Sequence, residues 1–243
     1  MKIVKHIPNT ITSMNLLCGV LGVICTFNGR PDTAFILMLA AAVCDFCDGL
    51  SARALNAYSN VGKELDSLAD LISFGMLPAI MLHKLMISTG NSGFIAYIPL
   101  AIVVFSALRL AKFNVDERQT ENFIGLATPA CAMICGAFAY YVCKETDSVL
   151  YSWASTKAFI PAGSVILSLL LVSEIPMFSM KFKKNMKKDT PVYRQRVAFA
   201  GVIFVSIVLV ILLGLNWSMS VILIFVSYIV MNAGEHLIFR KRR

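Results

Sequence analysis

The sequence predicts an all-α protein, built as a polytopic membrane bundle of about eight transmembrane helices. Composition is the first observation behind this fold class: of the 243 residues, 58% are hydrophobic and 15% are charged, whereas a soluble domain averages about 25% charged residues. Hydropathy is the second, because its mean is +0.74 and long apolar segments alternate with short polar ones. We expect one membrane domain over residues 1–243, since no linker, repeat or low-complexity segment marks a second one.

The expected spans follow the apolar segments in order. Pro8 opens the first span, and Pro129 falls inside the fifth, where a membrane helix tolerates a kink. The last two spans add only hydrophobicity, whereas the motif-bearing core covers about 8–184. The eight ranges are 8–28, 33–57, 61–86, 92–114, 123–143, 157–176, 197–215 and 218–239, the last two lying within a C-terminal region of 197–239.

The distribution of cations predicts the orientation. Eight spans place both termini on one side of the membrane, and eighteen of the 22 Lys and Arg residues fall on that side. Cytoplasmic loops carry an excess of Lys and Arg, so both termini are expected in the cytoplasm. The formal net charge of +8 would suggest nucleic acid in a soluble protein. Here topology explains it, and we expect no nucleic-acid partner. The largest basic group is the loop after the sixth span, with Lys181, Lys183, Lys184, Lys187, Lys188, Arg194 and Arg196.

Four aspartates lie toward that same side. Asp45 and Asp48 are three positions apart near the end of the second span, and Asp66 and Asp70 are four apart near the start of the third. On helices each pair shares a face, with Cβ atoms roughly 5–6 Å apart. Two charges about 4 Å apart repel by roughly 4 kcal/mol at an effective dielectric of 20. Mg²⁺ or Mn²⁺ would remove that repulsion, and two such ions form the usual clamp for displacement at phosphorus.

Small residues and a cation surround the aspartates. Gly49, Ala52 and Gly62 would let helix backbones, or a flat nucleotide, approach closely. Arg53 could pair with a phosphate or with an aspartate. The alternative is that the acids are salt-bridged helix ends and that the glycines only pack.

A polar and small stripe follows one face of the first span. Thr12, Asn15 and Gly19 lie at positions i, i+3 and i+7. Such a stripe packs helices together through hydrogen bonds, or it faces a ligand. Both interpretations are open from these residues alone.

The pattern resembles the signature of the CDP-alcohol phosphotransferases, D-x-x-D-G-x-x-A-R, eight residues, then G-x-x-x-D-x-x-x-D. Every fixed position is present with the right spacing. The resemblance implies that Asp45, Asp48 and Asp66 hold two divalent metal ions, Mg²⁺ or Mn²⁺. It also implies that Asp70 touches the second ion and acts as general base. A homodimer is implied as well. The expected CDP-binding residues are Gly49, Ala52, Arg53, Gly62, Thr12 and Asn15.

Further segments resemble the integral-membrane phosphatidylserine synthases of bacteria. These segments are Pro8-Asn9, the run from Asn15 to Gly19, and the run from Arg109 to Asn114, in which Lys112 replaces an Arg. The resemblance implies CDP-diacylglycerol and L-serine as substrates, membrane lipids as partners, and a bacterial cytoplasmic membrane with the site facing the cytoplasm. Arg109 and Lys112 would bind the lipid phosphate or the serine carboxylate, or serve only as interfacial anchors.

Other functions remain open at this point. The acceptor alcohol could be glycerol 3-phosphate or an inositol derivative. A divalent-cation transporter also holds carboxylates inside a membrane. It places them near the midplane, however, whereas the four aspartates of this chain are expected near one interface. A non-catalytic lipid-binding scaffold is a third possibility, and it gives no reason for a complete set of four aspartates.

Overall fold

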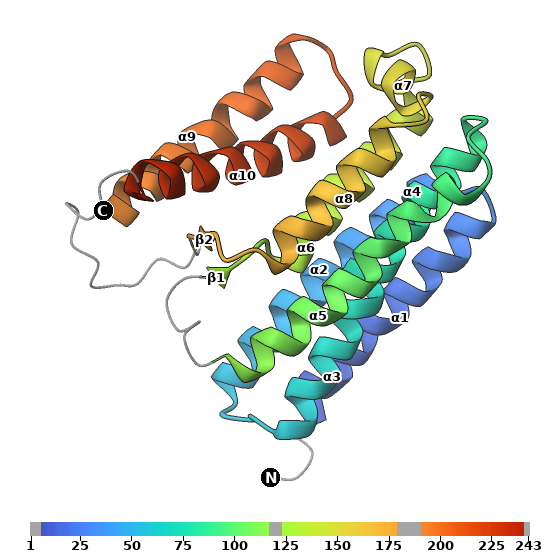
Figure 1. Cartoon of the computed structure of the whole chain (residues 1–243). Coiled ribbons are helices and arrows are strands. Elements are labelled where there is room, and N and C mark those ends of the chain that lie inside the picture. Colours follow the sequence, from blue (N-terminus) through green and yellow to red (C-terminus); the bar gives the residue numbers. More distant parts are fainter. Residues whose placement is uncertain (1–5, 117–122, 179–190, 241–243) are drawn as a thin grey trace.

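The computed structural model describes residues 6–116, 123–178 and 191–240. Its fold is helical, as expected: one group of helices runs side by side in a bundle, and the α9–α10 pair lies along one flank (Figure 1). The basic loop from Lys181 to Lys188 and the final cations, from Lys241 on, lie outside the described residues.

Helices α1 (Ile7–Phe27) and α2 (Pro31–Ala54) form an antiparallel hairpin. The buried face of α1 is small and polar, including Thr12, Asn15, Gly19 and Gly22. Its apolar side chains point outward; Leu17, for example, is 57% exposed. This inside-out pattern is typical of membrane helices, because small residues let helices approach while lipid solvates the apolar side chains.

Helix α2 shows the same inside-out pattern in the turns that carry the aspartates. Val43, Phe46 and Leu50 have exposed fractions of 62%, 63% and 44%. Asp48 lies between them in the sequence and is buried. The turns of α2 that carry the acids therefore present apolar side chains to the surroundings on another face.

The third span is one continuous helix with a wide turn in it. Ser59 caps its start by accepting a 3.0 Å hydrogen bond from the Gly62 backbone N–H. The turn that follows Asp70 is π-helical, a feature that the sequence pattern did not predict. The three parts are α3 (Asn60–Asp70), η2 (Leu71–Met76) and α4 (Leu77–Ser88).

The fifth span begins later than expected. Pro129 does not kink it, because α6 starts at Thr128 and the proline occupies the first turn, where its missing N–H costs no hydrogen bond. The residues before it form a two-residue strand, β1 (Phe123–Ile124), paired antiparallel with β2 (Pro176–Met177). The other elements here are η3 (Phe94–Leu100), α5 (Ala101–Val115), α6 (Thr128–Lys144), α7 (Val149–Ala154) and α8 (Phe159–Val172).

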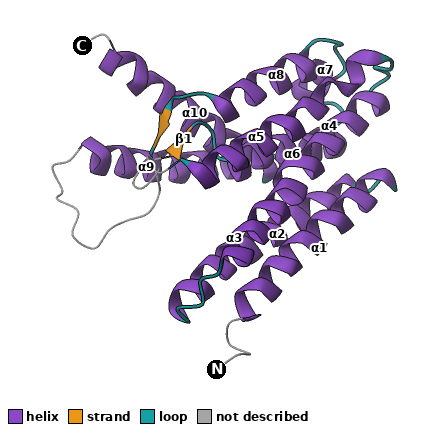
Figure 2. Ribbon diagram, turned by 60° about the horizontal axis from the view of Figure 1, so that its bottom comes forward, coloured by secondary structure: helices purple, strands orange, loops and turns teal. Residues whose placement is uncertain are grey.

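The last two helices, α9 (Pro191–Leu212) and α10 (Ser218–Arg240), form a hairpin that is fastened to the strand pair. The hydroxyl of Tyr228 donates to the Phe178 carbonyl at 2.9 Å, and the Phe178 N–H donates to Asn232 Oδ1 at 2.8 Å. Figure 2 shows the two strands lying beside this hairpin. The hairpin is thus joined to the bundle through backbone groups as well as apolar contacts.

Six helices of the described chain are long and apolar enough to cross a membrane. The protein is therefore an integral membrane protein. Helices α6 and α8, with 17 and 14 residues, correspond to the other two expected spans and are shorter. The count of eight and the orientation of the termini stay predictions. The six spans are Ile7–Phe27, Pro31–Ala54, Asn60–Ser88, Phe94–Val115, Tyr193–Leu212 and Ser218–His236.

Candidate metal and nucleotide site

Three of the four aspartates converge between α2 and α3. Asp45, Asp48 and Asp66 each offer a carboxylate oxygen, and these oxygens all lie within 4.8 Å of one another. The C-terminal part of α2 and the start of α3, which carry these residues, lie toward the end of the bundle where α1 begins (Figure 1). The helical spacing that predicted two pairs therefore produces one cluster, because α2 and α3 approach each other with their acidic faces together.

The donor set suits a hard divalent cation. All three groups are carboxylates, which Mg²⁺ and Mn²⁺ prefer. Asp66 Oδ1 is buried and has no hydrogen-bond partner among the described residues. A buried acceptor without a donor is costly, and a cation would satisfy it. The residues present thus fit the metal that the sequence predicted.

Asp70 lies one turn further along the helix and outside this group of three. It is buried, with 8% exposed, and Asn15 Nδ2 donates to its Oδ1 at 3.2 Å. Asp48 also has a partner on α1, because Thr12 Oγ1 donates to its Oδ2 at 2.6 Å. Helix α1 thus holds one carboxylate of each acidic pair.

A cavity of about 440 Å³ opens beside the aspartates. Five of the six expected CDP-binding residues line it together with Asp48 and Asp66, but Asn15 does not. Asp45 and Asp70 are also absent from its lining. The residues around it are Pro8, Asn9, Thr12, Asp48, Gly49, Ala52, Arg53, Ala57, Tyr58, Ser59, Gly62, Lys63, Asp66 and Phe113.

The two signature glycines act differently in this cavity. A Cβ at Gly62 would lie 2.8 Å from Asn9 Oδ1 and 3.0 Å from Ser59 Oγ, so a larger residue would displace these side chains where α1 and α3 come together. A Cβ at Gly49 would meet only Arg53 Nη2, at 3.9 Å. Gly49 therefore leaves room in the cavity, whereas Gly62 allows close packing of its wall.

Several lining residues had not been assigned to the site from the sequence, among them Asn9, Tyr58, Lys63 and Phe113. Lys63 Nζ donates to the Asn114 carbonyl at 2.9 Å, which ties α3 to the end of α5. Asn9 lies three positions before Thr12 on the polar stripe of α1, and that spacing was the available signal. Phe113 lies in the run from Arg109 to Asn114 that carries the resemblance, whereas Tyr58 carried no comparable signal.

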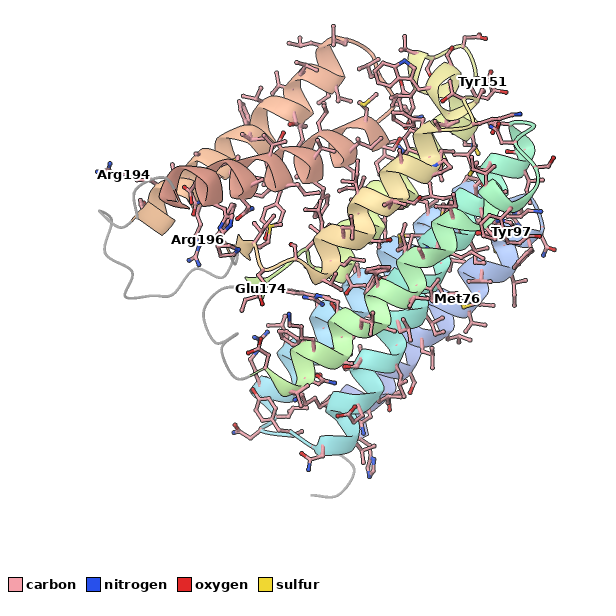
Figure 3. The ribbon with its side chains drawn as sticks, viewed as in Figure 1. Met76, Tyr97, Tyr151, Glu174, Arg194 and Arg196 are labelled. Atoms are coloured by element: carbon pink, nitrogen blue, oxygen red, sulfur yellow. The ribbon has the colours of Figure 1, made fainter. Side chains whose placement is uncertain are left out.

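The two expected anion-binding cations differ sharply. Arg109 is buried, its Nη1 donates to Thr128 Oγ1 at 3.0 Å, and its guanidinium lies 5.4 Å from the centre of the Phe113 ring. Lys112 is half exposed, and its Nζ is 3.9 Å from the carboxylate of Glu174, which is labelled in Figure 3. Neither side chain lines the cavity. Arg109 is held in place by its neighbours, and Lys112 is an exposed partner of a surface acid.

The chain is similar to characterised proteins over most of its length. A family model described as CDP-alcohol phosphatidyltransferase matches residues 5–173. The CDP-diacylglycerol–serine O-phosphatidyltransferase of Bacillus subtilis is 31% identical over 186 residues, which are 75% of this chain and 97% of that relative. The protein of the same name from Mycobacterium leprae is 34% identical over 182 residues, 72% of this chain and 58% of the relative. An archaetidylserine synthase of Methanothermobacter thermautotrophicus is 34% identical over 134 residues, 54% of this chain and 57% of the relative.

Proposed function

The chain belongs to the CDP-alcohol phosphatidyltransferase family, and from this premise we propose that it transfers the phosphatidyl group of CDP-diacylglycerol to the hydroxyl of L-serine, releasing CMP. The observation that carries the proposal is the convergence of Asp45, Asp48 and Asp66 within 4.8 Å, beside a cavity lined by the small residues of the family signature. Serine is favoured as the acceptor because the relatives from bacteria and from an archaeon are all named for transfer to serine, although their lipids differ.

The proposed reaction is a direct displacement at phosphorus. The serine oxygen bonds to the phosphorus next to the diacylglycerol, and the bond from that phosphorus to the oxygen of CMP breaks. The electron pair of the broken bond leaves with CMP. The hydroxyl proton passes to the carboxylate of Asp70, because a neutral alcohol is a poor nucleophile and needs a positioned base.

The remaining residues of the site would bind and orient the substrates. Two bound Mg²⁺ or Mn²⁺ ions would neutralise the pyrophosphate and stabilise the charge that develops during displacement. Asp45, Asp48 and Asp66 would hold these ions, with Asp70 beside the second. Thr12, Gly49, Ala52, Arg53 and Gly62 would contact CDP, because they line the cavity next to the acids.

Arg109 is proposed to bind the lipid phosphate or the serine carboxylate. Its burial and its bond to Thr128 support this role, because a guanidinium fixed by its neighbours loses little entropy on binding an anion. Lys112 is retained as a weaker candidate, since it is exposed and lies near Glu174.

We place the enzyme in a bacterial cytoplasmic membrane, with the acidic end of the bundle facing the cytoplasm. The excess of Lys and Arg that the sequence predicts on the side of the aspartates supports this orientation. A single domain over 1–243 and a homodimer are also proposed, the latter from family resemblance alone. Accessibility labelling of single-cysteine variants at Tyr58 and Thr146, at opposite ends of the bundle, tests the orientation.

The deciding experiment uses the purified enzyme with CDP-diacylglycerol and a panel of labelled alcohols, with Mg²⁺, with Mn²⁺ and with neither. We expect serine to be incorporated with release of one CMP, and only with a metal present. Serine incorporation no faster than that of glycerol 3-phosphate or an inositol derivative would refute the proposed acceptor. Metal flux into proteoliposomes without release of CMP would instead favour a transporter.

A further inference from the structure

Asn15 does not lie where a nucleotide contact would lie. Its side chain is fully buried in α1, and it is absent from the lining of the cavity that holds the other expected CDP-binding residues. Its amide nitrogen is instead 3.2 Å from Asp70 Oδ1. Building on the proposed function, we propose that Asn15 is a positioning residue for Asp70, which fixes one carboxylate oxygen so that the other is presented to the acceptor hydroxyl.

The bond to Asp70 is part of a chain that links α1 to the third span. Asn15 Nδ2 donates to Asp70, and Ser73 Oγ donates to the Asn15 backbone carbonyl at 3.0 Å. Both side chains of the third span lie on the face toward α1, because both are hydrogen-bonded to Asn15. The backbone and the side chain of Asn15 are therefore both held by the segment that carries the proposed base.

Close packing makes this chain possible. A Cβ at Gly19 would lie 2.4 Å from Ser73 Oγ and 2.9 Å from Ser73 Cα. Only glycine lets α1 come this near to η2, the π-helical turn that starts directly after Asp70. A π-turn accommodates an extra residue, so it rotates the side chains that follow relative to those before it. Met76, labelled in Figure 3, marks the end of this turn.

The orientation of the Asn15 amide follows from its neighbour. A carboxylate only accepts hydrogen bonds, so the nitrogen faces Asp70 and the oxygen faces away. Asn15 Oδ1 has no hydrogen-bond partner among the described residues. Among the described residues, the Asn15 side chain thus makes its hydrogen bond to Asp70. This is the arrangement expected of a residue that orients a carboxylate.

Two roles for Asn15 predict different kinetics. A positioning residue acts on the step in which the hydroxyl proton is taken, so its loss lowers kcat and leaves the affinity for CMP unchanged. A nucleotide contact acts on binding, so its loss weakens CMP and raises KM for CDP-diacylglycerol. With Mg²⁺ or Mn²⁺ at a saturating concentration, kcat and CMP affinity therefore separate the two roles.

The test compares Asn15→Leu, which keeps the volume and removes the donor, with Ser13→Ala on the same helix. Ser13 is exposed, and its hydroxyl donates to the Asn9 carbonyl of its own helix at 2.8 Å. We expect Asn15→Leu to lower kcat by about 10- to 100-fold, the loss typical of a hydrogen bond to a charged group. Calorimetric CMP affinity should change by less than about twofold, and Ser13→Ala should behave as wild type.

A second variant covers the case in which Asn15→Leu fails to fold in detergent, as judged by thermal unfolding. Ser73→Ala removes only the hydroxyl that holds the Asn15 carbonyl, and we expect a few-fold fall in kcat with unchanged CMP affinity. Weaker CMP binding with unchanged kcat, in either variant, would overturn the proposal and make Asn15 a nucleotide contact. Unchanged kcat and unchanged affinity in both variants would overturn it as well.

The wild-type protein, measured in parallel, separates this inference from the proposed function. If wild type releases CMP with an alcohol other than serine, the proposed acceptor is wrong, and the same comparison of variants is made with that alcohol. If wild type releases no CMP with any alcohol, the proposed function and the role of Asn15 are both refuted. Normal wild-type activity with normal variants refutes only the role of Asn15.

Discussion

Thr12 Oγ1 donates a 2.6 Å hydrogen bond to Asp48 Oδ2, and this bond joins α1 to the acidic face of α2. The same hydroxyl lies 3.0 Å from the Pro8 carbonyl of its own helix. Both residues are buried. A carboxylate held by such a neighbour keeps one orientation whether or not a cation is bound, so the site is partly preorganised for metal.

Loss of the Thr12 hydroxyl should weaken metal binding. We expect Thr12→Val to raise the Mn²⁺ concentration for half-maximal activity about 10-fold or more, because partners that orient metal ligands typically affect affinity to that extent. Thr12→Ser keeps the hydroxyl and should stay within about threefold of wild type. An unchanged metal requirement in Thr12→Val would show that Asp48 is not oriented in this way.

Neutralising Asp70 should stop the reaction without preventing binding. Asp70→Asn keeps the shape of the side chain and removes the base, so we expect CMP release to vanish while CDP-lipid still binds. The matched control is Asp32→Asn. Asp32 lies at the start of α2, at the other end of that helix from Asp45 and Asp48, where it is half exposed and pairs with Lys144 at 3.3 Å. That control should keep wild-type activity. Full activity in Asp70→Asn would remove Asp70 from the role of base.

Substitution of Arg109 and of Lys112, the two cations outside the cavity, should have unequal effects on substrate binding. Arg109→Gln should raise KM for serine or for CDP-diacylglycerol about 10-fold or more, because it removes a charged donor that the structure holds rigidly. Lys112→Gln removes an exposed cation 3.9 Å from Glu174 and should have little effect. Steady-state kinetics with each substrate varied in turn measures both. Equal, small effects would identify both residues as interfacial anchors only.

Gly125 should be irreplaceable for stability. Its φ is +78°, and a Cβ there would lie 2.6 Å from the Leu171 carbonyl oxygen and 2.8 Å from the Ser173 carbonyl oxygen. We expect Gly125→Ala to cost about 1–3 kcal/mol and to lower Tm in detergent by several degrees. Gly163→Ala in α8, where a Cβ meets nothing within 4 Å, is the control and should not lower Tm. Equal Tm values in the two variants would contradict this explanation.

The local features of the site could be predicted from the sequence because they depend on spacing along single helices. Asp45 and Asp48 share a face of α2 wherever that helix lies, and the same holds for the acids of α3. The small residues beside them predicted a cavity wall by the same reasoning. What brings the two faces together is packing, and the family resemblance supplied that part.

Features that depend on how helices cross could not be predicted in the same way. Thr12 and Asn15 belong to one stripe of α1, yet one lines the cavity and the other is buried against Asp70, 55 positions away in the sequence. The start of α6 was misplaced for a related reason. The apolar residues before Thr128 continue the hydrophobic pattern of the helix. Their backbone instead forms β1 and pairs with β2, so the helix begins only at Thr128.

The exposed apolar side of α2 has a consequence for how substrates arrive. Val43, Phe46 and Leu50 face outward on the turns that carry the acids. A phospholipid can therefore reach the site by lateral diffusion within the membrane, with its acyl chains still in the bilayer. Only the polar head group of the lipid has to move out of the membrane interface and into the site. The enzyme would then need no tunnel for fatty chains, and newly made lipid could drift away through the leaflet without ever meeting bulk water.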